Sequence, residues 1–263
     1  MKATRRILAL VLAGLAGSAS AATIYVDAAA TGTGNGTSWT DAYTTIQAAV
    51  DSAAFTSTSD ATILVAEGVY AETVTLAADN SGAEGFPNRI AAAPGEVVVI
   101  DGASSRNSGI VATSLAWFEF AGLTFTRTKS EGVKLTATDN ISFKDCVFNA
   151  NKHGIYIATS ALNTRYEGCL ISGSTTAGIY YSAAGTGEMI TNCQFVANTL
   201  AMYTRAPSGQ NVGVFRSVFS RNAAVAQVYA GGLSVDRCVF VENGPGIYLD
   251  HSRPVSVYNS IVA

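Results

Sequence analysis

The sequence has few charged residues, no dense basic stripe and no long apolar run after its first residues, and each shortage excludes a class of protein. Charged residues make up 13% of the 263 residues while hydrophobic residues make up 48%, which excludes a disordered chain. A net charge of -3 with 16 Lys and Arg argues against a nucleic-acid partner. No later stretch approaches the about 20 apolar residues of a transmembrane helix, so we expect no membrane span.

The first 21 residues have the pattern of an export signal. The start is basic, with Lys2, Arg5 and Arg6, and a short apolar run follows at residues 7–16. Ala19-Ser20-Ala21 supplies the small-residue cleavage pattern. We expect cleavage after Ala21 and a secreted protein, extracellular or periplasmic, that comprises residues 22–263. An uncleaved N-terminal anchor is the alternative.

The four cysteines reveal an internal repeat. Their spacings are 23, 24 and 45 residues, which indicates a period near 23 with one member missing. Similar segments align on anchors at residues 123, 146, 169, 193, 217, 238 and 260. Near-regular copies at this period predict a solenoid.

Each repeat contains three short segments in which inward apolar residues alternate with polar or small ones. The pairs before the anchors include Phe118 and Phe120, Ile141 and Phe143, and Val212 and Val214. The anchor begins a second such segment, and runs such as residues 154–157 form a third. Period-2 alternation predicts strands, and the repeat leaves no room for a helix. The sequence therefore predicts an all-β, single-stranded parallel β-helix of triangular cross-section, with about 23 residues per coil.

Three rows of equivalent residues follow from this register. The residues before the anchors are largely types that tolerate a left-handed corner, such as Gly122, Asp145 and Asn192. A second row consists of Asn151, Ser174, Asn198, Asn222 and Asn243. It predicts an asparagine ladder; the alternative is that asparagine is simply preferred in turns. The four cysteines share one inward column with parallel side chains, which favours free thiols over disulfides or a metal site.

Residues 40–54 are expected to form a helix that plugs the open end of the solenoid. Its apolar face consists of Tyr43, Ile46, Val50 and Ala53. Thr40 and Asp41 are the candidate capping residues.

The N-terminal third carries a family resemblance. The segments are Ile24-Tyr25-Val26-Asp27, residues 34–39, residues 46–50, Leu64-Val65-Ala66-Glu67-Gly68-Val69-Tyr70, residues 93–96 and Val99-Ile100-Asp101-Gly102. They resemble the opening of secreted right-handed parallel β-helix proteins of the pectin-lyase-like superfamily, which includes pectate and alginate lyases. The resemblance covers essentially the whole mature chain. It implies a right-handed coil, with residues 22–105 as cap and first coils and residues 106–263 as regular coils.

The resemblance also implies a chemistry. Such lyases remove the proton next to a uronate carboxyl by β-elimination, with Lys or Arg as base and carboxylates that hold calcium. The outward positions of the first strands cluster charges of both signs on three rungs. We therefore expect Lys144 and Arg165 to be catalytic, and Asp145 and Glu167 to orient them or bind calcium. An exposed salt-bridge ladder without a catalytic role is the alternative.

Four tyrosines occupy the outward middle position of the third strand. Tyr156, Tyr180, Tyr203 and Tyr248 are expected to form an aromatic column that binds substrate by stacking on sugar rings. Rings that merely cover the strand face are the alternative.

Two functions follow from these expectations. One is a secreted polysaccharide lyase whose partner is an acidic glycan, and the other is a non-catalytic extracellular scaffold or adhesin with a carbohydrate-binding solenoid. Residues 255–263 begin a further rung without a cap, so we expect the chain to continue there or to meet a neighbouring domain.

Overall fold

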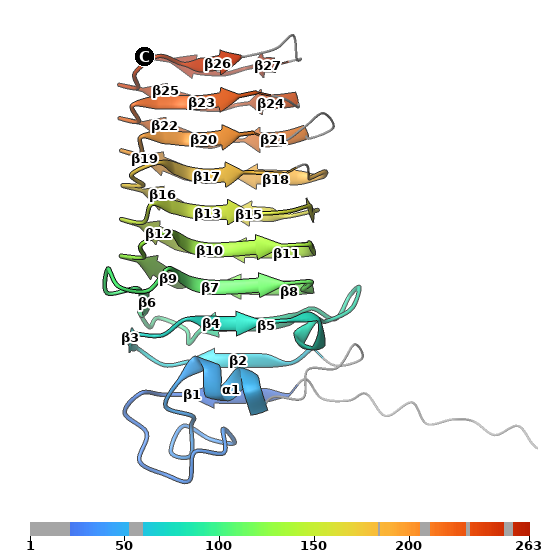
Figure 1. Cartoon of the computed structure of the whole chain (residues 1–263), viewed down its shortest axis with the longest axis vertical. Helices are drawn as coiled ribbons and strands as arrows, with labels where there is room; N and C mark the ends of the chain where they lie inside the picture. The colour runs from blue at the N-terminus through green and yellow to red at the C-terminus, as the bar shows by residue number, and fades with distance from the viewer. Residues whose placement is uncertain (1–21, 53–59, 184, 206–210, 230–231, 250–254) are drawn as a thin grey trace, which may run out of the picture.

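Short parallel strands stack into three sheets in the computed structural model, which describes residues 22–263 except 53–59, 184, 206–210, 230–231 and 250–254 (Figure 1). Successive coils each supply a strand to each sheet, so every strand pairs in parallel with its equivalent in the next coil. The other two strands of the coil provide the crossover that a parallel pair requires. The architecture is the predicted parallel β-helix; the expected signal peptide, residues 1–21, lies outside the described residues.

The three sheets are named A, B and C here in the order in which a regular coil meets them. Sheet A contains β1 (Thr23–Val26), β2 (Thr62–Val65), β5 (Asn88–Ala92), β8 (Ala116–Ala121), β11 (Thr138–Lys144), β14 (Ala161–Leu162), β15 (Arg165–Glu167), β18 (Glu188–Thr191), β21 (Asn211–Phe215), β24 (Gly232–Asp236) and β27 (Val255–Tyr258). Sheet B contains β3 (Gly68–Tyr70), β6 (Val98–Asp101), β9 (Leu123–Thr126), β12 (Val147–Asn149), β16 (Leu170–Ser172), β19 (Gln194–Val196), β22 (Val218–Ser220), β25 (Val239–Val241) and β28 (Ile261–Val262). Sheet C contains β4 (Val74–Leu76), β7 (Ser108–Thr113), β10 (Glu131–Thr136), β13 (His153–Ile157), β17 (Ala177–Tyr181), β20 (Leu200–Thr204), β23 (Ala224–Val228) and β26 (Ile247–Leu249).

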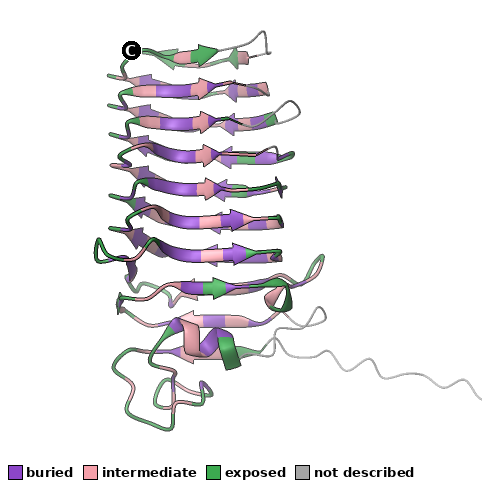
Figure 2. Cartoon of the chain, viewed as in Figure 1, coloured by how far each residue is buried: buried purple, intermediate pink, exposed green. Residues whose placement is uncertain are grey.

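The core is a column of stacked apolar side chains between the sheets. Figure 2 shows the alternation along the strands, where buried segments are interrupted by partly exposed ones. Phe195 and Phe219 pair in register, and their rings stack with centroids 4.7 Å apart and planes 4° from parallel. The ring of Phe240 continues the stack at 5.0 Å from Phe219. The predicted inward register is therefore confirmed.

Sharp corners separate sheet A from sheet B, and an amide ladder lines the corner between sheets B and C. The non-glycine corner residues adopt left-handed backbone, such as Asp145 (φ 51°) and Asn192 (φ 54°). In the ladder, Asn198 Nδ2 donates to Asn222 Oδ1 at 3.0 Å, and Asn222 Nδ2 donates to Asn243 Oδ1 at 2.9 Å. Both predicted rows are present.

The cysteine column is confirmed as a buried row of free thiols. Ser217 occupies the missing position, where its Oγ accepts a hydrogen bond from the Cys193 amide at 3.1 Å. Burial raises the pKa of Cys238, and the pKa of Cys169 is also raised, chiefly by the neighbouring Cys146 thiol. The Cys169 and Cys238 thiols are therefore shielded from solvent and stay protonated.

The N-terminal helix is shorter than predicted. The helix α1 spans Ile46–Ser52, and its buried residues pack against the N-terminal coil as expected. The Glu72 carboxylate accepts hydrogen bonds from the amides of Ile46 and Gln47 at 2.8 and 2.9 Å, and so caps the helix from a distant segment.

The expected helix start at residues 40–41 is wrong, because Asp41 and Tyr43 make other contacts in the structure. Asp41 Oδ1 accepts hydrogen bonds from the amide and hydroxyl of Thr33 at 2.8 and 2.9 Å. Tyr43 forms a bridge to Val26 in strand β1. The predicted helical residues 53–54 lie outside the described residues.

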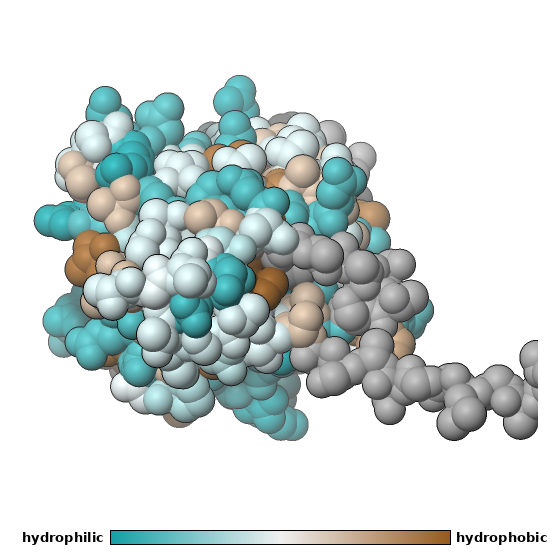
Figure 3. Space-filling view, turned by 90° about the horizontal axis from the view of Figure 1, so that it is seen from below, coloured by the Kyte–Doolittle hydropathy of each residue, from teal (hydrophilic) through white to brown (hydrophobic). Residues whose placement is uncertain are grey.

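The N-terminal end presents a mostly hydrophilic or pale surface, viewed directly in Figure 3. Ile46, Ala49 and Val50 of α1 face the core there and are buried. The helix therefore covers the apolar interior at this end, in agreement with the predicted plug. Within the described part of the chain, no helix is both long enough and apolar enough to cross a membrane.

Candidate functional site

The outer face of sheet A carries the charged residues expected to be catalytic. Strand register aligns its outward side chains in two columns that run along the solenoid axis. The first column contains Arg89, Glu119, Ser142, Arg165, Met189, Gly213 and Ser234. The second contains Ala121, Lys144, Glu167, Thr191, Phe215 and Asp236.

Glu119 holds two cationic side chains on this face. Lys144 Nζ lies 2.6 Å from Glu119 Oε2, and Arg89 Nε lies 2.8 Å from Glu119 Oε1. The Glu119 side chain is only 10% exposed, whereas that of Lys144 is 45% exposed. One largely buried carboxylate therefore orients an accessible ammonium group and leaves a net positive charge in this cluster. Arg89 was missed because it lies in a first coil, outside the regular repeat.

Lys144 and Arg165 occupy successive strands but different columns. Lys144 pairs in register with Glu167, whereas Arg165 pairs with Ser142. The two cations are therefore diagonal neighbours, one strand apart along the axis and two residues apart along the strand, and their catalytic role stays a prediction. Both side chains nevertheless point outward on the same face, and both residues are exposed.

Asp145 and Glu167 are also exposed, but they supply few oxygens for an ion. Asp145 sits at the left-handed corner, where its carboxylate lies over Gly168 and occupies the space of a Cβ. No group of three or more His, Cys, Asp or Glu residues that could hold a metal is found among the described residues. Calcium takes about six to eight oxygen ligands, so these two carboxylates do not form a dedicated site. The calcium assignment stays a prediction.

The predicted tyrosine column lies on sheet C, away from the Lys144 face. The rings of Tyr156 and Tyr180 have centroids 5.1 Å apart, and those of Tyr180 and Tyr203 are 4.6 Å apart. Tyr248 is in the same column, but Gln227 lies between it and Tyr203. The structure thus places three mutually tilted rings in a row, with a separate exposed ring, on a different sheet from the expected catalytic residues.

Two hollows lie on the outer face of sheet A. One has a volume of about 330 Å³ and is lined by Met189, Thr191, Phe215, Arg216, Asp236 and Arg237. The other has a volume of about 290 Å³ and adjoins Gly213 and Ser234. Sequence reasoning missed the first hollow. The outward position of Phe215 and the corner positions of Arg216 and Arg237 are visible in the repeat and could have indicated it.

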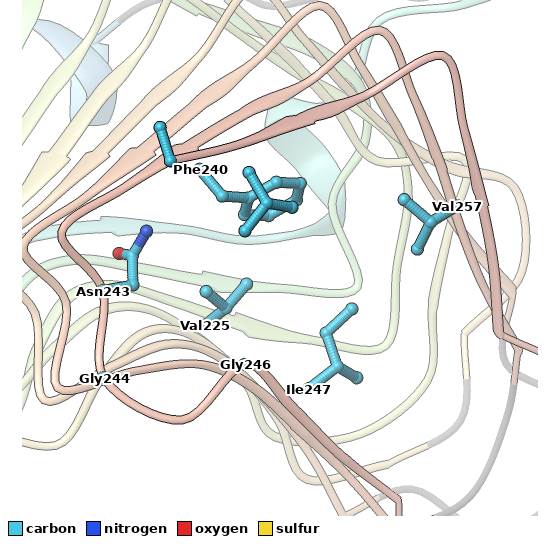
Figure 4. Close-up of a pocket in the computed structure, with 9 residues that line it drawn as sticks. Val225, Phe240, Asn243, Gly244, Gly246, Ile247 and Val257 are labelled. Carbon is cyan, nitrogen blue, oxygen red and sulfur yellow. The ribbon is translucent and has the colours of Figure 1, made fainter.

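A third hollow, of about 280 Å³, lies within the last coil. Figure 4 shows Phe240 of sheet B and Val225 and Ile247 of sheet C pointing into it. Its lining is mostly apolar core residues of the solenoid rather than outward polar groups. It therefore has few groups that could recognise a sugar, and the expected continuation of the chain beyond it stays a prediction.

Solved structures share this fold at low sequence identity. A pectate lyase, Pel9A, has a TM-score of 0.69 at 18% identity, over 85% of this chain and 64% of that chain. This chain thus spans 64% of the length of that lyase. A pectin methylesterase from carrot has a TM-score of 0.70 at 14% identity, over 94% of this chain and 85% of that chain. An alginate lyase from Paenibacillus sp. has a TM-score of 0.50 at 12% identity, over 82% of this chain and 95% of that chain.

Comparison with curated protein sequences gives no match. Residues 43–200 match the family described as the right-handed beta helix region. This match covers more than half of the chain and confirms the right-handed coil implied by the resemblance. The chain belongs to the right-handed β-helix family.

Proposed function

We propose that this protein is an exported polysaccharide lyase that cleaves an acidic glycan on the outer face of sheet A by β-elimination. The observation that carries the proposal is the pair of cations held by Glu119, with Lys144 Nζ accessible at 2.6 Å from its carboxylate. Proteins with this fold include a pectate lyase and an alginate lyase, which supports an acidic polysaccharide as the substrate class. The same assignment places the substrate on sheet A beside Lys144 and Arg165.

In this reaction a base removes the proton on the carbon next to a uronate carboxyl. The electron pair of that C–H bond forms a C=C bond, the C–O bond to the glycosidic oxygen breaks, and that oxygen takes up a proton. The guanidinium of Arg165 neutralises the charge that develops on the carboxylate. Lys144 in its neutral amine form accepts the proton, while Glu119 holds its side chain in place.

The test is Lys144→Ala, assayed by the ultraviolet absorbance of the unsaturated product on pectate, alginate and glycosaminoglycans. We expect loss of turnover with little change in melting temperature, because a partly exposed ion pair contributes about 1 kcal/mol or less. Lys129→Ala is the matched control, since Lys129 is exposed at a corner away from sheet A. Wild-type activity in Lys144→Ala would remove Lys144 from the mechanism.

A second candidate function is glycan binding without cleavage, and the row of tyrosine rings on sheet C favours it. Tyr156, Tyr180 and Tyr203 present a continuous partly exposed aromatic row that suits sugar rings. In that case no glycan yields unsaturated product, and Tyr180→Leu weakens glycan binding without a change in fold.

A further inference from the structure

The hollow that crosses strands β18, β21 and β24 has the size and lining of a binding site for one small ligand unit. Its volume of about 330 Å³ lies at the lower end of the range of about 300–1,000 Å³ for small-molecule sites. It combines an apolar floor with cationic side chains on one rim. This combination is absent from the Lys144 cluster, where the neighbouring outward residues are small or charged.

The floor is the ring of Phe215, which lies over the neighbouring Gly213 of the same strand. A Cβ at Gly213 would lie 2.7 Å from Cε2 and 3.2 Å from Cζ of this ring, so any other residue would displace it. Without that side chain the ring lies along the strand and remains partly exposed. The exposed side chain of Met189 on the adjacent strand extends the apolar floor. Such a surface suits the apolar face of a pyranose ring.

The cationic rim consists of Arg216 and Arg237, at the same corner of successive coils. Both adopt left-handed backbone (φ 48° and 54°), and coils repeat at about 4.8 Å. Arg237 Nε lies 3.6 Å from Asp236 Oδ2, and Asp236 also accepts a hydrogen bond from Asn259. Arg216 forms no ion pair with any described residue. The rim therefore contains two guanidinium groups and one carboxylate, and it carries excess positive charge.

We propose that this hollow binds a carboxylate-bearing sugar unit, with its ring on Phe215 and its carboxylate on Arg216 and Arg237. A guanidinium group matches a planar carboxylate through two parallel hydrogen bonds, which a neutral sugar cannot offer. Phe215 shares the outward column of Lys144 and lies three strands further along it, about 14 Å away. The inference rests on the proposed function for its substrate class, and it assigns a holding site distinct from the Lys144 cluster.

Methionine methyl groups provide a local test. Met189 lines the hollow, whereas Met202 is buried in the core, so in ¹³C-methyl-methionine protein the methyl signal of Met189 serves as reporter and that of Met202 as internal control. Trigalacturonate and trimannuronate are titrated into the Lys144→Ala variant, because this variant is expected not to cleave either trisaccharide. We expect a saturable shift of the Met189 signal with at least one of the two, no shift of Met202, and no Met189 shift with fully methyl-esterified trigalacturonate.

Substitutions then assign the contacts. Arg216→Gln should weaken the binding about tenfold, because it removes a charged hydrogen-bonding group. Phe215→Leu should weaken it about fivefold, because it keeps an apolar side chain without the ring face. Arg221→Gln is the matched control: Arg221 is an exposed arginine at a left-handed corner (φ 53°) outside the hollow, and its loss should leave affinity unchanged.

The outcomes separate this site from the proposed catalysis. A silent Met189 signal with both uronates, an equal shift with the neutral ester, or unchanged affinity in Arg216→Gln overturns the binding site. Full lyase activity in Lys144→Ala together with the expected Met189 shift overturns the catalytic assignment and leaves the binding site standing.

Discussion

Burial sets the behaviour of individual titratable residues in this solenoid, and His153 is the clearest case. Its ring packs beside the rings of Tyr156 and Tyr180, whose centroids are 5.6 and 4.9 Å away. Burial, with a smaller contribution from the nearby Lys152 charge, lowers the pKa of His153 to about 4. His153 is therefore neutral in the folded protein at pH values where an unfolded histidine is protonated.

This shift predicts acid sensitivity. The folded pKa lies below the ordinary value of 6.5, so the unfolded chain binds the proton first and stability falls as the pH drops below about 6.5. The loss should reach about 2 kcal/mol near pH 5, where most carboxylates are still ionised. Urea unfolding of wild type and His153→Phe at about pH 8 and about pH 5 measures it. Equal pH dependence in the two proteins would contradict the assignment.

Among the structural elements, the amide ladder joins neighbouring coils through side-chain hydrogen bonds. Asn222 Nδ2 donates to Phe195 O at 2.8 Å and to Asn243 Oδ1 at 2.9 Å. Its Oδ1 accepts from the amide and the side chain of Asn198, both at 3.0 Å. One buried side chain therefore satisfies polar groups of three coils.

Asn222→Ala should lower the free energy of unfolding by about 3 kcal/mol, because several buried polar groups lose their partner. Urea denaturation measures the change. Asn149→Ala is the control: Asn149 is exposed and accepts a hydrogen bond from Ser172, so its loss should cost less than about 1 kcal/mol. A similar small cost at both positions would mean that the ladder contributes little to stability.

On the scale of the whole molecule, the single continuous core extends through every regular coil. The four cysteine thiols lie in this core at four levels along the axis, from Cys146 to Cys238, and all four are buried. Because each coil contacts only its neighbours, exposure of any one thiol requires the solenoid to open at that level.

The native protein should therefore leave Ellman's reagent unreacted, and the unfolded protein should release four equivalents without reductant, matching the four cysteines. Fewer equivalents after unfolding would reveal a disulfide and contradict the stacked thiol row. Rapid reaction of the native protein would show that coils open independently.

The sequence alone determined the coil period, the inward register and the corner rows. These features depend on local rules: side chains of a strand alternate with period 2, and the same short pattern returns in each coil. The stacked rings of Phe195 and Phe219 and the left-handed Asp145 follow directly from that register. Local patterning therefore sufficed for the fold.

The tertiary structure alone decided the features that join distant segments. The helix starts at Ile46 because Glu72, 26 residues away, caps it, and Lys144 is positioned by Glu119 rather than by its register partner Glu167. The hollow over Phe215 likewise needs a glycine in its own strand and arginines from two coils. Which long side chain reaches which partner depends on rotamers and on competing neighbours in space, and a repeating sequence pattern does not encode that choice.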